Sequence, residues 1–209
     1  FEEIWQTEYL MQVVEGALIT TSANKTAYVN TINELRGLDG TGGLVVVGGY
    51  YEQGKAGGGN FYWDENSTIS DDGGYSILPT SQSPSTDGRW IRLFAENDRV
   101  YSSQWGCVKD EVDVSSQLAN AVDFAVSKGV NLVIDSRVDM GGFEANINSG
   151  CIVRESFVNT DNVNFNLNVK IEVLGFVADK LTFIGTLINE YVRPDWFDSN
   201  VWANITDQS

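Results

Sequence analysis

The segment that most restricts the fold is VNFNLNVKIEV, Val163 to Val173, in which every second residue is apolar. Its apolar residues share one parity: Val163, Phe165, Leu167, Val169, Ile171 and Val173. Successive side chains of a strand point to opposite faces, so this period of two predicts a β-strand with one buried face. From Gly141 to Glu190 we expect only short strands, separated by Asn, Asp, Ser and Gly. A β-helix and a β-sandwich fit this pattern equally well.

A helix is predicted in the segment Asp113 to Gly129 because apolar residues recur there at helical spacing. These residues are Val114, Leu118, Ala121, Val122 and Ala125. Asp113 or Ser115 is expected to accept the first free backbone N–H groups, and Gly129 to end the helix. A strand over Val130 to Asp135 is expected to follow directly.

Two more helices are expected nearer the N-terminus. Phe1 to Glu15 contains good helix formers and is followed by Gly16, which stops the helix. A seven-residue spacing of Ile4, Met11 and Leu18 leaves two alternatives open, a coiled-coil stem or a helix packed on its own domain. The second helix is predicted from about Lys25 to Arg36, with Val29, Ile32 and Leu35 on one side.

Between these helical segments the sequence predicts a small β subdomain rich in turns. Leu44 to Val47 and Asn60 to Trp63 are expected as strands, and Arg89 to Phe94 as an alternating strand. Asp72-Gly73-Gly74 is a hairpin signal that leads into Tyr75 to Leu78. The expected core of this subdomain consists of Phe61, Trp63, Ile77, Trp90 and Leu93.

Composition excludes several classes of function. The 209 residues include 29 acids, 13 bases and no histidine, for a net charge of −16. Such a charge repels phosphate backbones and anionic lipids, so nucleic acid is a poor partner. Without histidine, Ser-His-Asp, Cys-His and His-zinc chemistry are excluded. No apolar run approaches the roughly 18 residues of a membrane span, and no signal segment begins the chain.

Three residues are candidates for ligand binding: Trp63, Asp64 and Trp90. Trp63 with Asp64 would form a sugar-stacking platform beside an acid, whereas the alternative assigns the aromatic residues to the core of a small domain. The acids Asp64, Glu65, Asp71 and Asp72 raise the possibility of Ca²⁺, but turn formation accounts for them. We therefore expect no metal, no cofactor and no catalytic residue in this chain.

Charged pairs and cysteines also have structural interpretations. Arg89 and Arg92, on either side of Trp90, are expected on one face of their strand and paired with the surplus acids, or else bound to an acidic partner. Asp195 and Asp198 could form the carboxylate pair of a glycosidase, although a linker position argues against it. Cys107 and Cys151 are expected to be reduced core residues.

Two sequence stretches resemble phage tailspike proteins. GGGNFYWDENSTISDDGGYSILP, followed by GRWIRLF, is similar to the segment of many tailspikes between the virion-attachment end and a pectate-lyase-like β-helix. WGCVKDEVDVSSQLANAVDFAVSKGVNLVID, from Trp105, resembles the start of that β-helix, with a Trp-containing strand, an acidic turn, a capping helix and the first strand. The two matches have the order and spacing of the family. VRPDWFDSNVWANITDQS resembles a lead into another such β-helix, which implies that the natural protein continues.

The resemblance implies a mainly β fold with a few short helices and a trimeric assembly. Four regions are expected: an N-terminal helical stem or attachment segment over 1–40, the small Gly- and aromatic-rich β subdomain over 41–99, a capping helix with β-helix-like or sandwich-like strands over 100–190, and a linker over 191–209 into a missing C-terminal body.

The function implied by the resemblance is that of the N-terminal region of a homotrimeric tailspike, which anchors a receptor-binding or glycan-degrading body to the tail. The expected partners are other tail or baseplate proteins and, through the missing body, host surface polysaccharide. The expected location is the tail of the virion, after assembly in the bacterial cytoplasm. The alternative is the catalytic or glycan-binding part of a polysaccharide depolymerase.

Overall fold

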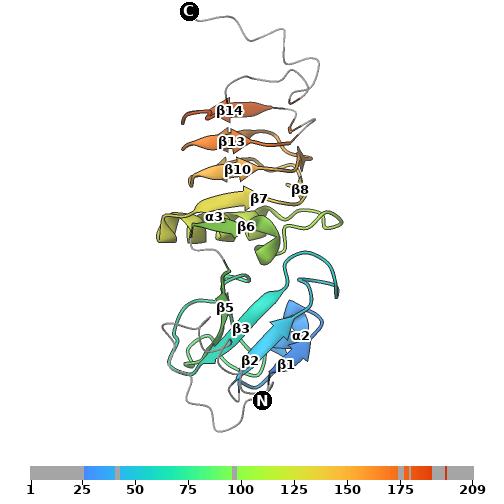
Figure 1. The fold of residues 1–209 in the computed structure, drawn as a ribbon, viewed down its shortest axis with the longest axis vertical. Coiled ribbons are helices and arrows are strands. Elements are labelled where there is room, and N and C mark those ends of the chain that lie inside the picture. Colours follow the sequence, from blue (N-terminus) through green and yellow to red (C-terminus); the bar gives the residue numbers. More distant parts are fainter. Residues whose placement is uncertain are drawn as a thin grey trace, which may run out of the picture.

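The computed structural model describes residues 26–40, 43–95, 98–173, 177–178, 180–189 and 196. These residues form a small β-sheet with a short helix, followed by a stack of parallel strands with a longer helix beneath it (Figure 1). The fold is mainly β. The expected helix Phe1 to Glu15, its seven-residue spacing and the acids Asp195 and Asp198 lie outside the described residues.

The small sheet has the strand order β1-β2-β3-β5-β4. Its strands are β1 (Ala27–Val29), β2 (Leu44–Val47), β3 (Gly59–Asp64), β4 (Ser76–Ile77) and β5 (Arg89–Leu93). β1 pairs with β2 in parallel and the other pairs are antiparallel. The strands predicted in β2, β3 and β5 are confirmed. Of the predicted core, Phe61, Ile77 and Trp90 are buried, while Trp63 and Leu93 are half-buried.

The helix predicted over Lys25 to Arg36 is wrong in its first half. Ala27–Val29 is strand β1, and the helix α2 covers only Ile32–Arg36. Thr31 supplies the cap, because its hydroxyl accepts a hydrogen bond from the Glu34 N–H at 3.1 Å. Pairing of β1 with the apolar strand β2 outweighs the helical spacing of Val29, Ile32 and Leu35, all of which still reach the same core.

The hairpin predicted at Asp72-Gly73-Gly74 is also wrong. β4 pairs with β5, and β3 pairs with β5 as well, so the loop at Asp72 does not connect neighbouring strands. The Asp72 carboxylate instead accepts hydrogen bonds from the N–H groups of Gly74, Tyr75 and Ser76 at 2.8–3.0 Å. The aspartate organises a loop through its side chain, which a turn signal in the sequence does not distinguish from a hairpin.

The second unit is a stack of parallel strands with the geometry of the start of a β-helix. One sheet has the order β13-β10-β7-β6, a second pairs β11 with β8, and a third has the order β14-β12-β9. The strands are β6 (Arg99–Tyr101), β7 (Asn131–Ile134), β8 (Val138–Asp139), β9 (Ala145–Ile147), β10 (Cys151–Val153), β11 (Phe157–Val158), β12 (Val163–Phe165), β13 (Val169–Ile171) and β14 (Leu181–Phe183). All pairs are parallel, so the sandwich alternative is excluded for this region.

Each turn of the stack repeats after 18 or 19 residues. Leu132, Cys151 and Val169 are in register on one sheet, and Ala145, Val163 and Leu181 on another. On the outer surface, Asn164 donates to the Asn146 side chain at 3.0 Å from one turn to the next. We call each such turn a rung, and the described strands form three of them.

The long strand predicted over Val163 to Val173 is wrong, because the chain turns a corner within it. β12 and β13 belong to different sheets, and Leu167 at the corner is 52% exposed. Val163, Phe165, Val169 and Ile171 nevertheless point into the core, as the alternation predicts.

The helix α3 (Ser115–Lys128) lies beneath the first rung and closes the core of the stack (Figure 1). It confirms the helix predicted there, and Gly129 ends it with a φ of 65°. The capping prediction is wrong: the N-cap is Val114, and no side chain caps it, because Asp113 accepts from the Ser115 hydroxyl instead. A 3₁₀ helix η1 (Ser102–Trp105) joins β6 to this region. The described residues contain no helix that is long and apolar enough to cross a membrane.

Candidate functional site

The tryptophans of the candidate ligand site form a cross-strand pair. Trp63 on β3 lies opposite Trp90 on β5, with ring centroids 5.2 Å apart in an edge-to-face arrangement. Trp90 is only 2% exposed, so its ring is not open to a ligand in this conformation. The Trp63 ring fits between Gly40 and Gly88, where a Cβ atom on either glycine would overlap it. This packing is that of core residues, and sugar binding by the pair stays a prediction.

Asp64, the third candidate, ends strand β3. Its carboxylate accepts a hydrogen bond from the Asn66 N–H at 3.1 Å and so shapes the turn that follows. Asp64 lies opposite Arg89 in the register of the sheet. The Arg89 guanidinium nevertheless points elsewhere, so the candidate acid is not brought into an ion pair with its neighbour across the strands.

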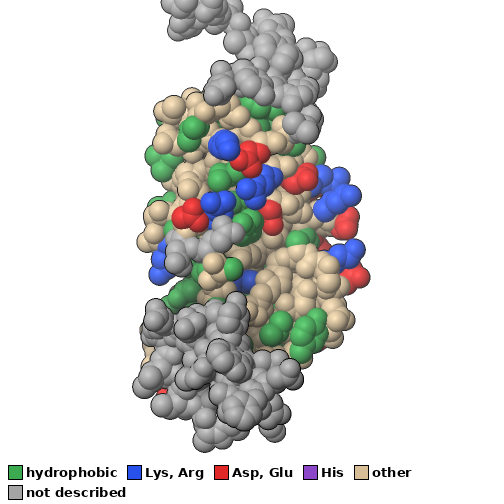
Figure 2. Space-filling view, in the orientation of Figure 1, with side chains coloured by type: hydrophobic (Ala, Val, Ile, Leu, Met, Phe, Trp, Pro, Cys, Tyr) green, Lys and Arg blue, Asp and Glu red, His purple; other side chains and the backbone are tan. Residues whose placement is uncertain are grey.

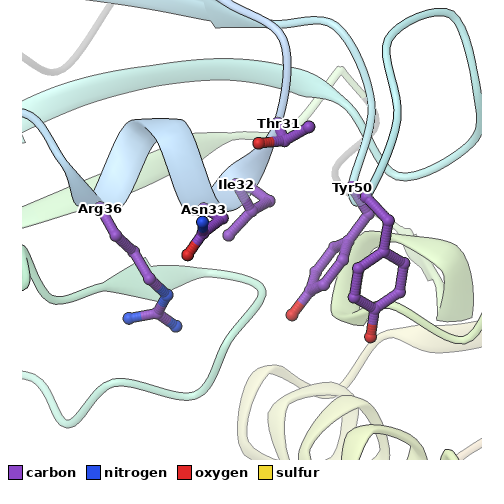
Figure 3. Close-up of a pocket in the computed structure, with 6 residues that line it drawn as sticks. Thr31, Ile32, Asn33, Arg36 and Tyr50 are labelled. Carbon is purple, nitrogen blue, oxygen red and sulfur yellow. The ribbon is translucent and has the colours of Figure 1, made fainter.

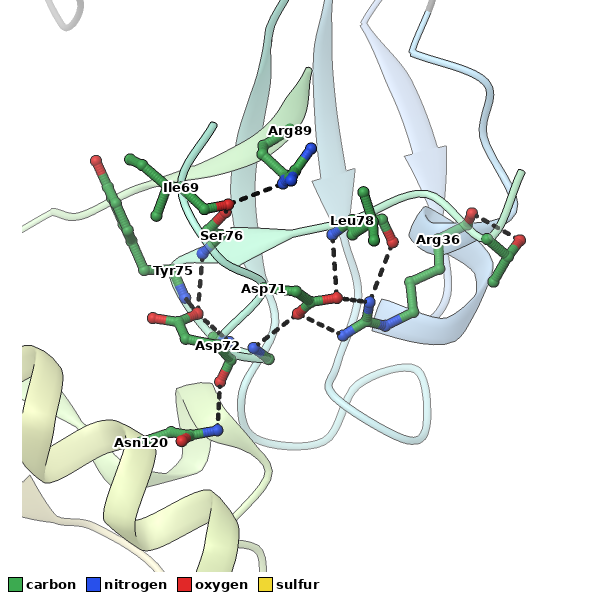
Figure 4. Close-up of polar contacts among 12 residues, drawn as sticks. Arg36, Ile69, Asp71, Asp72, Tyr75, Ser76, Leu78, Arg89 and Asn120 are labelled. Carbon is green, nitrogen blue, oxygen red and sulfur yellow. Dashed lines mark hydrogen bonds and ion pairs between the residues drawn. The ribbon is translucent and has the colours of Figure 1, made fainter. Parts of the chain in front are cut away.

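Two neighbouring acids of the predicted cluster, Asp71 and Asp72, point to different partners (Figure 4). Asp71 forms a two-point ion pair with Arg36 of α2, in which Nη2 and Oδ1 are 2.9 Å apart. The same carboxylate accepts the Leu78 N–H at 3.2 Å. Asp72 instead binds the amides of its own loop, so the two acids have separate structural roles. Within the described ranges no group of three His, Cys, Asp or Glu residues is placed to hold a metal ion.

The prediction that Arg89 and Arg92 lie on one face and pair with acids is wrong. The two are three residues apart on β5, so they point to opposite faces of the sheet. Both are buried, and the hydrogen bonds of both guanidinium groups go to backbone carbonyl groups. Arg89 donates to Ile69, Pro84, Thr86 and Gly88, and Arg92 donates to Gly57, Gly58, Gly74 and Gln104.

Burial lowers the pKa of Arg92 to about 9, which leaves it charged at neutral pH. The guanidinium carbon also lies 4.5 Å from the centroid of the Phe61 ring, a cation–π contact. Carbonyl dipoles and an aromatic face thus replace the carboxylate that a buried cation usually has.

A pocket that the sequence did not predict lies beside α2, with a volume of about 250 Å³ (Figure 3). Its lining residues are Thr31, Ile32, Asn33, Arg36, Tyr50 and Tyr51. Burial raises the pKa of the Tyr50 and Tyr51 hydroxyls, so both stay protonated and can donate hydrogen bonds. With Arg36 committed to Asp71, the pocket offers hydroxyl and amide groups to a neutral polar ligand. The Tyr50-Tyr51 pair after a glycine turn is the sequence signal that could have pointed to it.

Cys107 and Cys151 are both free and buried, which confirms the prediction for them. Burial raises the pKa of each thiol, so neither is an activated nucleophile. Among the residues that the structure describes, Asp64, Asp71 and Asp72 use their carboxylates to stabilise turns and loops or to form an ion pair.

Comparison with protein families gives a match over the small sheet. Residues 28–95 match the family described as phage tail protein small four-stranded beta-sheet domain. This range covers β2 to β5, together with α2 and most of β1. No curated protein matches the sequence.

Solved structures with a similar fold include phage tailspike proteins. The tailspike of Acinetobacter baumannii bacteriophage Fri1, a capsular polysaccharide depolymerase, matches 77% of this chain with a TM-score of 0.52 and 19% identity. The tailspike of Acinetobacter phage vB_ApiP_P1 matches 77% of the chain with a TM-score of 0.48 and 21% identity. The enzymatically active domain of tailspike protein 2 from bacteriophage CBA120 matches 90% of the chain with a TM-score of 0.49 and 14% identity. The chain spans 36%, 29% and 30% of the lengths of these proteins, respectively.

Proposed function

We propose that this chain, a tailspike-related region whose small sheet is a phage tail protein domain, anchors a host-binding or glycan-degrading body to the virion tail. The observation that carries the proposal is the order of the two units. A tail protein domain comes first, and a β-helix stack of the tailspike fold continues directly from it. With this order, the small sheet would lie next to the virion tail, and the β-helix would lead to the host-binding or glycan-degrading body.

The way in which the chain uses its charged residues supports a role in assembly. Asp71, Asp72 and Asp135 all hold backbone or arginine groups in place. On the β-helix, basic and acidic side chains are intermixed (Figure 2). Arg154 and Lys170 both form ion pairs with Glu172. This mixed charged surface is typical of a face that is exposed to solvent.

The proposed partners follow from this role. The small sheet would contact another tail or baseplate protein, and three copies of the chain would associate along their β-helices. Host surface polysaccharide would be bound by the body that lies beyond these residues. Assembly would take place in the bacterial cytoplasm, before the virion is released.

Attachment is tested by competition for virions that lack their tailspike. Purified chain, added first, should occupy the tails and reduce later binding of the full-length protein, measured as particle-bound tailspike. Two exposed apolar residues provide matched variants: Tyr28 on β1 is 54% exposed and Ile184 on the third rung is 72% exposed. Tyr28→Asp should weaken the competition and Ile184→Asp should leave it unchanged. No competition by the folded wild-type chain would refute the attachment role.

The trimer is tested by light scattering at micromolar concentration. A mass three times that of the chain is expected, and a monomer would remove the trimer from the proposal without affecting the attachment test.

The alternative function, glycan degradation or binding within this chain, is tested separately. Incubation with host capsule or lipopolysaccharide should give no new reducing ends and no unsaturated uronate. Clear product would overturn the proposal in favour of a depolymerase. A glycan-array signal that is lost in the variant Trp63→Ala would instead identify a glycan-binding module.

A further inference from the structure

Two aromatic residues of the small unit pack into the core of the β-helix, which is separate from the core of the small sheet itself. Tyr75 and Phe94, from the small unit, pack against Trp105 and Phe124, from the start of the β-helix. The ring centroids are 4.8 Å apart for Tyr75 and Phe124, and 6.3 Å apart for Phe94 and Trp105. A hinge between independent domains would leave a gap or a polar contact at this level, whereas here four rings fill it.

The backbones of the two units also approach closely. A Cβ atom on Gly74 would overlap the Trp105 ring, and one on Gly57 would overlap the Ser103 carbonyl group. Both glycines therefore permit contacts across the junction that another residue would prevent. On the side of α3, the Asn120 amide donates to the Asp72 carbonyl at 3.0 Å (Figure 4).

Arg92 connects these contacts. From strand β5 its guanidinium donates to Gly57, Gly58 and Gly74 of the small unit at 2.6–3.1 Å. The same group donates to the Gln104 carbonyl of η1 at 3.1 Å, across the junction. It is 2% exposed, and its four hydrogen bonds to Gly57, Gly58, Gly74 and Gln104 all go to carbonyl groups. Its position is thus set by both units together, and each unit loses a buried partner if the other moves away.

We infer that the described parts of 43–95 and 98–189 form one cooperative unit, in which Arg92 and the four aromatic rings hold the small sheet at a fixed orientation to the β-helix axis. Force or rotation applied to the β-helix would then reach the tail protein domain without being absorbed at a joint. This coupling is independent of which protein the domain binds, and it holds whether or not the attachment test succeeds.

Hydrogen–deuterium exchange of the full chain, followed by mass spectrometry, tests the inference. In the wild-type protein, peptides from β3 and β5 and peptides from β7 and β10 should exchange through the same opening event, with one shared denaturant dependence. Two clearly different opening events in the wild type would overturn it.

Arg92→Met and Arg89→Met form a matched pair of variants for the same measurement. Arg89 is also buried, but its four carbonyl partners all belong to the small unit. Arg89→Met should therefore speed exchange by the same factor in both sets of peptides, because the unit stays cooperative. Arg92→Met should separate them, with exchange faster by about 30-fold or more in β3 and β5 than in β7 and β10. Equal acceleration of both sets by Arg92→Met would refute the role of Arg92.

Two further measurements cover the case in which Arg92→Met does not fold. Asn120→Ala removes one exposed contact across the junction and should reproduce the separation of the two peptide sets in weaker form. In Arg92→Ala, millimolar ethylguanidinium, which replaces the missing atoms, should restore folding and shared exchange, whereas in Arg89→Ala the two peptide sets should exchange together with or without it. Absence of both effects would overturn the inference.

Discussion

Two buried arginines of one strand show how this acidic chain stabilises cations without using its acids. A turn exposes several carbonyl groups at once, and a guanidinium group has five N–H donors in a plane to receive them. Arg89 and Arg92 each fold a glycine-containing loop around themselves in this way. The surplus carboxylates stay in the solvent, where their hydration is not lost.

Trp63 is the residue at which the core and sugar-binding interpretations can be separated. Replacing Trp63 with alanine should lower the free energy of unfolding by about 3 kcal/mol, because the ring fills the space between two glycines and packs on Trp90. Urea unfolding gives this value. Trp63→Phe should retain much of the stability, whereas an alanine variant as stable as the wild type would favour an exposed binding platform.

Glu172 should make a small pH-dependent contribution. Hydrogen bonds from Lys170 and then Arg154 hold the pKa of Glu172 below its ordinary value of 4.5. A carboxylate with a lowered pKa stabilises the fold above its unfolded pKa, and the effect is lost as the pH falls through the folded value. Glu172→Gln should therefore cost about 0.5 kcal/mol at pH 7, since the pair is partly exposed, and less at pH 3.

Urea unfolding at the two pH values measures this difference. Glu144→Gln is the control, because Glu144 is exposed and forms no ion pair within the described part of the chain. A cost for Glu172→Gln that is as large at pH 3 as at pH 7 would show that packing, not charge, is responsible.

At the scale of the element, the corner between β12 and β13 explains what an alternating sequence does and does not determine. The alternation correctly predicts that Val163, Phe165, Val169 and Ile171 face inward. It does not predict where the chain turns, because a corner residue such as Leu167 keeps the apolar parity while pointing outward. Corner positions depend on the neighbouring rungs, which lie 18 residues away in sequence.

Phe165 and Leu167 should differ strongly in a stability measurement although both belong to the same alternating pattern. Phe165 is buried and stacks on Phe183 with centroids 5.6 Å apart, so Phe165→Ala should cost about 3–4 kcal/mol. Leu167→Ala should change the stability by less than about 0.5 kcal/mol because the side chain is exposed. Thermal or urea unfolding of both variants checks the pair, and similar costs would contradict the corner.

Particular residues show which parts of the structure can be predicted from the sequence. The strands around Phe61 and Trp90 and the helix before Gly129 follow from local patterns, and the structure has them. The rung repeat was visible in Asn146 and Asn164, but only for a reader who compares segments 18 residues apart. The carbonyl partners of Arg92 come from three distant loops, so no local pattern specifies them.

For the molecule as a whole, the net charge of −16 should decide how salt affects stability. Raising the salt concentration from about 0.01 M to 0.1 M shortens the screening length from about 30 Å to about 10 Å, which weakens long-range repulsion among the acids. The same change weakens exposed ion pairs such as that of Arg154 with Glu172, each worth at most about 1 kcal/mol. Because the repulsion is summed over many acids, we expect the Tm to rise by about 2 °C.

Calorimetry in sodium chloride measures this shift, with an equal osmolarity of sucrose as the control for effects unrelated to charge. A Tm that falls with salt would show that the ion pairs outweigh the overall repulsion.

The rung repeat has a consequence for how such proteins can be rebuilt. Leu187 is bridged to Val169 in the parallel register of the lower rungs, so the described part of the stack reaches a position from which a further strand can continue the same pattern. A different β-helix body could be grafted at this level if its first strand has the phase of Leu187 and its inward residues match Val169 and Phe183 in volume. The base would then serve as a common adaptor, and the exchange of bodies between such proteins would require a match over a single rung only.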